Sequence, residues 1–181
     1  IDENWLHYDN GICETGIGGP ESFYWGVMFP AATLQQHGGD MLSKVAVYDN
    51  TADTLELLVY YGGDYAPEVL VHTQTFELTG SKSFVEIDLT SYLPIDMNQN
   101  LWIVLCSNNG TDYPAAACSD TGDPNGRWLS EDGGMTWFDM ADYGLNYTWM
   151  IRAFVSDESG SAVAELKPIN DYEYKSSKGK L

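Results

Sequence analysis

The chain has 181 residues, the length of a single domain that can bury a substantial core. Its formal net charge is −19, so phosphate backbones and anionic membranes are not expected partners. No apolar run approaches the ~20 residues of a membrane-spanning helix, and an aromatic content of 13% argues against disorder. We therefore expect a folded, acidic domain that binds no nucleic acid and does not insert into membranes.

Strand patterns dominate the first half of the chain. Residues 23–29 are aromatic and apolar and stop at Pro30, and residues 31–37 have the composition of one helical turn. In residues 54–61 and 84–89 apolar side chains alternate with polar ones, which predicts strands with one face toward a core. Further strands are predicted over residues 41–49 and 68–78.

The second half continues this pattern. Residues 101–106 form an unbroken apolar run, typical of a central strand buried on both faces. Residues 107–125 are rich in Asn, Asp, Gly and Pro and are predicted as a loop, and residues 147–155 as a long closing strand. Nine or ten short strands with almost no helix predict an all-β fold, an antiparallel jelly-roll β-sandwich of the galactose-binding-like kind over residues 1–157.

Residues 158–181 are predicted to form a linker or an extra C-terminal strand that leads to a following domain. The chain begins at Ile1 without a secretory leader, so we expect it to be a processed or excised piece of a longer protein.

Three cysteines leave at least one thiol unpaired within the chain. Cys106 and Cys118 flank an eleven-residue loop, and a disulfide between them is one alternative. The other is that Cys13, Cys106 and Cys118 are buried free thiols that act as small apolar side chains.

Residues 130–137 read Ser-Glu-Asp-Gly-Gly-Met-Thr-Trp, which predicts a tight hairpin. Asp132 can accept hydrogen bonds from backbone amides in its own turn, and Trp137 can anchor the hairpin on the domain. The segment resembles the Asp-box of sialidases and other secreted β proteins, whose defining positions are filled by Ser130, Asp132, Gly134, Thr136 and Trp137. The resemblance implies a structural role, and a single copy argues against a β-propeller.

The order of several segments resembles an adhesin-like accessory module of secreted or surface proteins of Bacteroidetes, found behind peptidase or fibronectin-type domains. The segments are residues 24–30, 113–118, 121–128, 145–152 and the Asp-box. The resemblance implies a non-catalytic jelly roll that binds or positions. The Asp-Gly-rich calcium loop of the related gingipain adhesin modules is missing near the N-terminus, so their calcium and host-protein binding are not carried over.

Aromatic side chains at predicted loop tips, next to Asp and Asn, suggest a platform for stacking a sugar ring. The alternative is that these rings pack in the core or brace loops. The candidate ligand-binding residues are Asp64, Tyr65, Asn109, Asp112, Tyr113 and Trp128.

The loop around Asp120, Asp123 and Asn125 offers oxygen ligands of the kind that Ca²⁺ requires, so a structural calcium ion is one prediction. The alternative is a loop capped by its own Asx side chains. No other cofactor is expected.

Catalytic patterns are missing from the sequence. No pair of carboxylates stands out among the 27 Asp and Glu, and His7, His37 and His72 are isolated from any nucleophile motif. Arg127 and Arg152 are expected to pair with carboxylates. We predict a non-catalytic binding or adhesion module of a larger secreted or cell-surface bacterial protein, with a glycan or protein ligand. The alternatives are an accessory domain that supports a neighbouring peptidase and a glycoside hydrolase-related enzyme.

Overall fold

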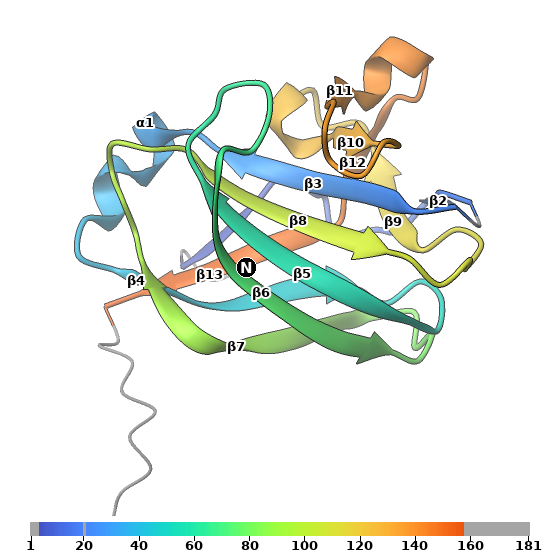
Figure 1. Ribbon diagram of the computed structural model, residues 1–181, viewed down its shortest axis with the longest axis horizontal. Helices are drawn as coiled ribbons and strands as arrows, with labels where there is room; N and C mark the ends of the chain where they lie inside the picture. Colours follow the sequence, from blue (N-terminus) through green and yellow to red (C-terminus); the bar gives the residue numbers. More distant parts are fainter. Residues whose placement is uncertain (1–3, 20, 158–181) are drawn as a thin grey trace, which may run out of the picture.

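A computed structural model describes residues 4–19 and 21–157 of the chain (Figure 1). The predicted linker or strand at 158–181 lies outside the described residues. The strands are β1 Trp5–His7, β2 Thr15–Ile17, β3 Phe23–Phe29, β4 Met41–Tyr48, β5 Asp53–Tyr61, β6 Val69–Leu78, β7 Phe84–Pro94, β8 Leu101–Ser107, β9 Ala115–Ser119, β10 Trp128–Ser130, β11 Phe138–Asp139, β12 Tyr147–Trp149 and β13 Ile151–Ser156. The short helical elements are α1 Ala31–Leu34, η1 Gln35–His37, η2 Pro124–Gly126 and η3 Met140–Tyr143.

The predicted all-β class and jelly-roll order are confirmed. One sheet has the order β1-β13-β4-β7, and the core of the other has the order β3-β8-β5-β6. If these eight strands are numbered along the chain, the two sheets read 1-8-3-6 and 2-7-4-5, and every pairing is antiparallel. This is the strand order of a jelly roll, built from two Greek keys.

Strand β8 is buried along its whole length, as the apolar run at 101–106 predicts. Leu101, Ile103 and Leu105 point into the core between the sheets, whereas Trp102, Val104 and Cys106 point outward into a second cluster. Trp128 and Trp137 complete this outer cluster and cover the far face of the sheet. The six-stranded sheet is therefore packed on both faces.

The open edges of the two sheets are joined by one side chain. Gln74 on β6 donates from Nε2 to the Asp88 carbonyl, and its Oε1 accepts from the Thr90 amide on β7, at 3.0 and 2.9 Å. These bonds satisfy backbone groups that an open edge would otherwise expose.

The prediction of a loop throughout 107–125 is wrong for residues 115–119, which form β9 between β2 and β12. Three alanines have low strand propensity, but β9 is a central strand whose first four residues are buried. The predicted strand at 147–155 is divided at Met150, because its first half pairs with β9 and its second half with β4 and β1.

All three cysteines are free thiols, so the alternative of a Cys106–Cys118 disulfide is wrong. Cys106 lies in the outer cluster of the six-stranded sheet, whereas Cys118 packs with Ala116 and Met150 in a separate one. The prediction that the thiols pack as apolar groups holds for both of these buried cysteines.

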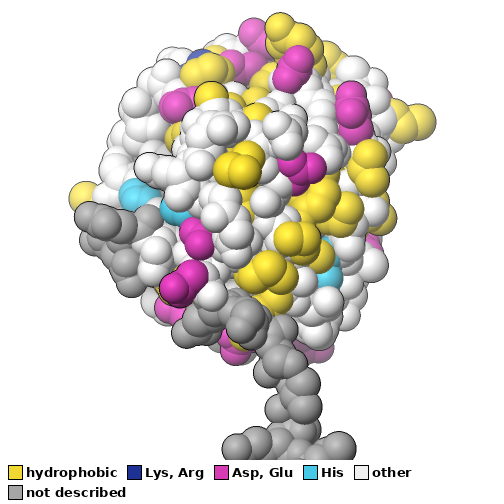
Figure 2. Space-filling view, turned by 90° about the vertical axis from the view of Figure 1, so that its left-hand side faces the viewer, with side chains coloured by type: hydrophobic (Ala, Val, Ile, Leu, Met, Phe, Trp, Pro, Cys, Tyr) yellow, Lys and Arg dark blue, Asp and Glu magenta, His cyan; other side chains and the backbone are white. Residues whose placement is uncertain are grey.

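Lys and Arg are scarce in the part of the chain that the structure describes, which holds four of them. Seen from the end that carries α1, the molecule shows Asp, Glu and hydrophobic side chains but scarcely any Lys or Arg (Figure 2). The two arginine side chains form ion pairs with carboxylates of the same chain. Arg152 on β13 binds both carboxylate oxygens of Asp9, at 2.9 and 2.5 Å, and its guanidinium lies 3.7 Å from the centre of the Phe84 ring.

The Asp9–Arg152 pair generates a stability prediction. Asp9 is 3% exposed, so Asp9→Asn leaves the Arg152 charge without its partner in a mostly buried site. We expect the free energy of unfolding to fall by roughly 3 kcal/mol, the usual cost of removing one partner of a buried pair. Urea unfolding measures this, with the exposed Glu77→Gln as the matched charge-removal control. A loss below about 1 kcal/mol, the range of a surface pair, would contradict the assignment.

Candidate functional site

The predicted ligand-binding residues do not form one site. Asp64 and Tyr65 follow β5, whereas Asn109, Asp112 and Tyr113 follow β8. Strand β8 begins beside Tyr61 and ends beside Leu55, so these loops lie at opposite ends of the sheet, about 20 Å apart at 3.3 Å per residue.

Two of these residues brace their own loops. Asp64 Oδ1 accepts a hydrogen bond from Asn100 Nδ2 at 2.9 Å. Asn109 Nδ2 donates to Asp53 Oδ1 and to the Thr54 carbonyl, at 2.9 and 2.6 Å. Tyr65 and Tyr113 are 78% and 61% exposed, so their rings remain available for contact.

The placement of Trp128 at an exposed loop tip is wrong. Its side chain is 9% exposed, and its ring lies 5.4 Å from that of Trp102 in the outer cluster. The reason is that Trp128 opens β10, which pairs with β3 and turns this side chain toward the outer face of the sheet.

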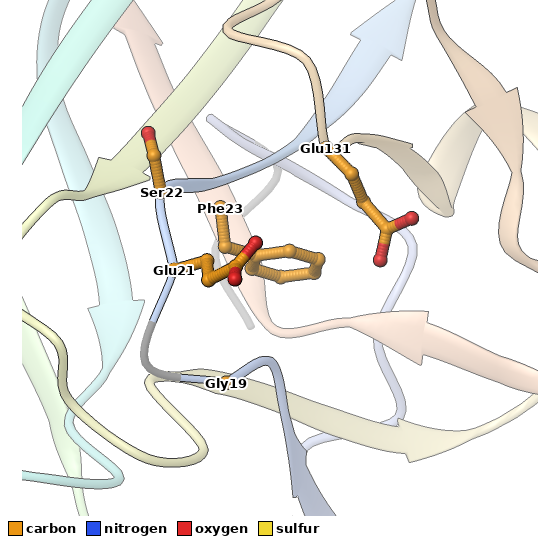
Figure 3. A pocket seen from close by; sticks show the side chains of 5 residues that line it. All are labelled: Gly19, Glu21, Ser22, Phe23 and Glu131. Atoms are coloured by element: carbon orange, nitrogen blue, oxygen red, sulfur yellow. The ribbon is translucent and has the colours of Figure 1, made fainter.

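A pocket that we call the acidic pocket lies at the end of the sandwich where β3 begins. It has a volume of about 430 Å³ and is lined by Gly19, Glu21, Ser22, Phe23 and Glu131. Figure 3 shows the carboxylates of Glu21 and Glu131 reaching into the same space, with the Phe23 ring between them.

Strand pairing explains how the acidic pocket is built. Ser130 pairs with Tyr24, so Glu131 leaves β10 beside the start of β3. Gly18 has φ +106° and approaches the Phe23 ring so closely that a Cβ would lie 3.0 Å from it. Glycine is therefore required where this loop passes the pocket.

A second cavity, which we call the Trp5 groove, lies at the other end of β3, between β1, α1 and η2. Its volume is about 300 Å³, and partly buried rings sit beside amide, hydroxyl and carboxylate groups. It is lined by Trp5, Leu6, His7, Tyr8, Phe29, Pro30, Thr33, Gln36, Asp123 and Asn125.

The aromatic rings of the Trp5 groove are held from behind. Trp5 packs edge-on against Phe154 with ring centres 5.0 Å apart, and Tyr8 stacks on Phe29 at 5.2 Å. Burial raises the pKa of Tyr8, and the nearby Asp123 carboxylate raises it further, so its hydroxyl stays protonated and donates to the Met28 carbonyl at 2.7 Å. The rings form a preformed wall.

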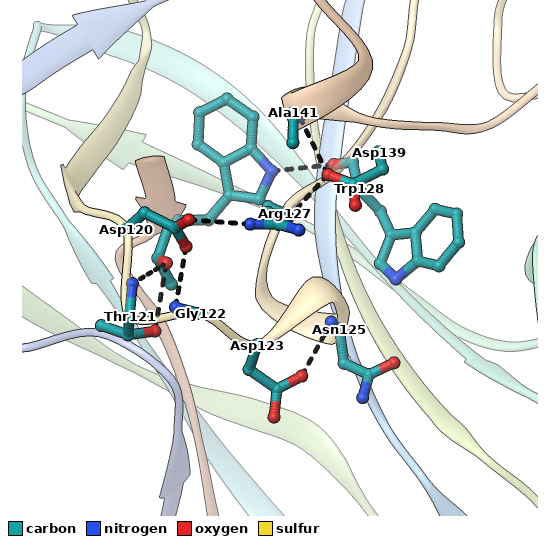
Figure 4. A network of polar contacts seen from close by, with 11 residues as sticks. Asp120, Thr121, Gly122, Asp123, Asn125, Arg127, Trp128, Asp139 and Ala141 are labelled. Atoms are coloured by element: carbon teal, nitrogen blue, oxygen red, sulfur yellow. Dashed lines mark hydrogen bonds and ion pairs between the residues drawn. The ribbon is translucent and has the colours of Figure 1, made fainter. Parts of the chain in front are cut away.

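The predicted calcium loop is held together by its own side chains (Figure 4). Asp120 accepts from the Gly122 amide and pairs with Arg127 at 2.9 Å, while Asp123 accepts from the Asn125 amide. Across residues 4–19 and 21–157, no three His, Cys, Asp or Glu side chains gather into a metal-binding group. A calcium ion at this loop stays a prediction.

Arg127 ties this loop to the strand that follows the Asp-box segment. Its guanidinium pairs with Asp120 and also with Asp139, at 2.9 and 2.7 Å. These carboxylates raise the pKa of Arg127 above its ordinary value, against the opposing effect of desolvation. The expected pairing of both arginines with carboxylates is confirmed.

The Asp-box segment forms a closed network. Asp132 Oδ1 accepts from the amides of Met135 and Thr136, at 3.0 and 2.8 Å, and from Ser130 Oγ at 2.8 Å. Trp137 Nε1 donates to the Gly134 carbonyl, and the ring packs against Trp102. Hydrogen bonds from Thr136, and then from Ser130 and Met135, lower the pKa of Asp132 to about 2.

Several pocket residues were not predicted from the sequence. Glu131 occupies a variable position of the Asp-box pattern, Glu21 lies in a short polar stretch, and Trp5 and Tyr8 precede the first predicted strand. The close spacing of Trp5, His7 and Tyr8 near the N-terminus was the available signal.

The described part of the chain has no helix long and apolar enough to cross a lipid bilayer.

The Asp132 network predicts a pH-dependent contribution to stability. Because its pKa is lowered, the carboxylate stabilises the fold above its unfolded value near 3.8, and this stabilisation is lost as the pH falls toward about 2. Asp132→Asn should therefore be less stable than the wild type at pH 5, with the difference closing near pH 2. Melting temperatures across this range test this, with exposed Asp142→Asn as control. A difference that stays constant with pH would contradict the role of the charge.

No family model and no curated protein sequence matches the chain. Several solved structures are similar in fold, among them two of a clostridial cysteine protease. The first holds the cysteine protease and lectin-like domains of Cwp84, a surface layer associated protein of Clostridium difficile, with a TM-score of 0.54 and 11% identity over 75% of this chain and 32% of that one. The second is the Clostridial cysteine protease Cwp84 after propeptide cleavage, with a TM-score of 0.60 and 12% identity over 86% of this chain and 41% of that one. The chain thus spans less than half of these proteins, and what it shares with them is the antiparallel β-sandwich fold.

Proposed function

We propose that this chain is a non-catalytic glycan-binding module of a larger secreted or cell-surface bacterial protein, and that the Trp5 groove is its binding site. The observation that carries the proposal is the groove itself, which combines a supported indole ring with polar groups that suit sugar hydroxyls. Sugar rings stack on flat aromatic faces, while amides and carboxylates orient their hydroxyl groups.

Unused polar groups in the Trp5 groove support this assignment. Among the described residues, the Thr33 hydroxyl and the Asn125 side-chain amide make no hydrogen bond to other side chains or to the backbone. Asp123 has one oxygen bonded to the Asn125 amide, which leaves the other for a ligand. A neutral sugar can satisfy these groups without bringing a charge into the groove.

The fold comparison supports the setting of the module. Cwp84 carries a lectin-like domain beside a cysteine protease and is associated with a surface layer. By analogy of fold, we infer that this chain lies beside a peptidase or another domain in its parent protein and acts there as an adhesin-like accessory.

A second candidate function, support of a neighbouring domain, is favoured by apolar side chains at the edge of the six-stranded sheet. Val69 and Leu70 at the start of β6 are 54% and 49% exposed, and Met97 in the loop between β7 and β8 is 37% exposed. Hydrophobic side chains gather in a band on the α1 end of the molecule (Figure 2). Such a patch fits a contact with another domain.

A glycan-array screen of four proteins, the wild type and three variants, tests the first proposal. The wild type should bind a defined subset of glycans, and Trp5→Ala should lose at least tenfold in affinity because the stacking ring is removed. Asn125→Ala should weaken binding by a smaller factor. Tyr65→Ala, which removes a ring that is 78% exposed outside the groove, should bind as the wild type.

The array also separates the two candidates. Loss of binding in Tyr65→Ala but not in Trp5→Ala would move the site to the loop tip. A blank array for the wild type would contradict glycan binding and favour the domain-contact role.

Melting curves with and without Ca²⁺ test the calcium prediction independently.

A further inference from the structure

The acidic pocket lies apart from the Trp5 groove, the proposed glycan-binding site. Phe23 at one end of β3 lines the acidic pocket and Phe29 at the other end lines the Trp5 groove, so about 20 Å separates them. The acidic pocket is therefore a separate site.

The two carboxylates at its rim have no cationic partner in the part of the chain that the structure describes. Each of the Lys and Arg side chains there is engaged elsewhere. Lys44 pairs with Glu86, Lys82 binds Asn50, Arg127 binds Asp120 and Asp139, and Arg152 binds Asp9. Two like charges that share a pocket repel each other, and a bound cation relieves this repulsion.

An apolar cavity adjoins the acidic pocket. It has a volume of about 270 Å³, shares Gly19, Phe23 and Glu131 with the acidic pocket, and adds Ile17, Gly18, Leu129, Tyr143 and Leu145. The Tyr143 ring is 52% exposed and stands at the side of this cavity. The acidic pocket and this cavity together offer two carboxylates next to hydrocarbon and aromatic surface.

This combination does not suit a metal ion. Calcium takes six to eight oxygen ligands, whereas an apolar surface cannot replace the water that a small cation loses. In the described residues no group of three metal-binding side chains forms here. An organic cation suits both kinds of surface, because its hydrocarbon part can pack on the apolar side chains while its charged group stays beside the carboxylates.

We propose that the acidic pocket binds an alkylammonium group. The ammonium donates hydrogen bonds to the carboxylates of Glu21 and Glu131, and the attached carbon atoms pack on Phe23 and Leu129. Charge-assisted hydrogen bonds of this kind are stronger than neutral ones, and the Tyr143 ring adds a cation–π surface. The same chemistry is presented by a lysine side chain of a partner protein and by an amino sugar with a free amine.

The test is a titration of the ¹⁵N-labelled full chain, followed by backbone amide shifts. The probes are Nα-acetyl-lysine methylamide and a glucosamine trimer, each compared with its N-acetylated form. Amides at Gly19, Glu21 and Glu131 should shift with at least one free amine, and acetylation should abolish the effect. Binding by the lysine probe alone identifies a protein source, and binding by the trimer alone identifies a glycan source.

Charge-removing variants complete the test. Glu131→Gln and Glu21→Gln should each weaken amine binding at least tenfold, and added NaCl should weaken binding to the wild type. The exposed Glu77→Gln, which removes a carboxylate outside the pocket, is the matched control and should bind amines as the wild type does. Equal binding of the acetylated probes, shifts confined to other parts of the surface, or undiminished binding by the double Gln variant would each overturn the proposal.

Discussion

The constraint on which the structure depends is the burial of β8 on both faces. Its inward side chains fill the space between the sheets, and its outward side chains, led by Trp102, require a cover of their own. That cover consists of Trp128, Trp137 and the 62–66 loop, whose Gly63 carbonyl accepts the Trp102 indole proton at 2.9 Å. Because the broad outer face of this sheet is occupied by its own chain, the cavities lie at the ends of β3.

The surface electrostatics follow from the small number of Lys and Arg side chains in the described residues. Within residues 4–19 and 21–157 the arginines stabilise the fold, with Arg152 on Asp9 and Arg127 between Asp120 and Asp139. The remaining carboxylates define what the surface can bind. This charge distribution disfavours anionic ligands. Our proposals assign a neutral ligand to the Trp5 groove, where aromatic and amide groups gather, and a cation to the acidic pocket, where two carboxylates meet.

The sequence predicts the parts of this fold that rest on local patterns. Alternation at 54–61 and 84–89 and the apolar run at 101–106 identify strands and their faces, because side-chain period and burial are encoded locally. Pairings between distant segments are not encoded in this way. Strand β9 is made of small residues and forms because β2 and β12 flank it. Asp49 accepts hydrogen bonds from the amides of residues 79–81, about thirty residues further along the chain, and no local sequence pattern predicts this contact. Both cavities are assembled from such distant segments, so neither could be read from one motif.

The central claim is that a ligand site lies at the Trp5 groove. The six indole N–H signals of the ¹⁵N-labelled protein test it directly during titration with a mixture of neutral hexose and N-acetylhexosamine oligosaccharides. We expect the Trp5 signal to move, while those of Trp25, Trp102 and Trp149, which are at most 1% exposed, stay in place. A ligand that moves the Trp137 signal instead, or that moves none of the six, would contradict a binding site at the Trp5 groove.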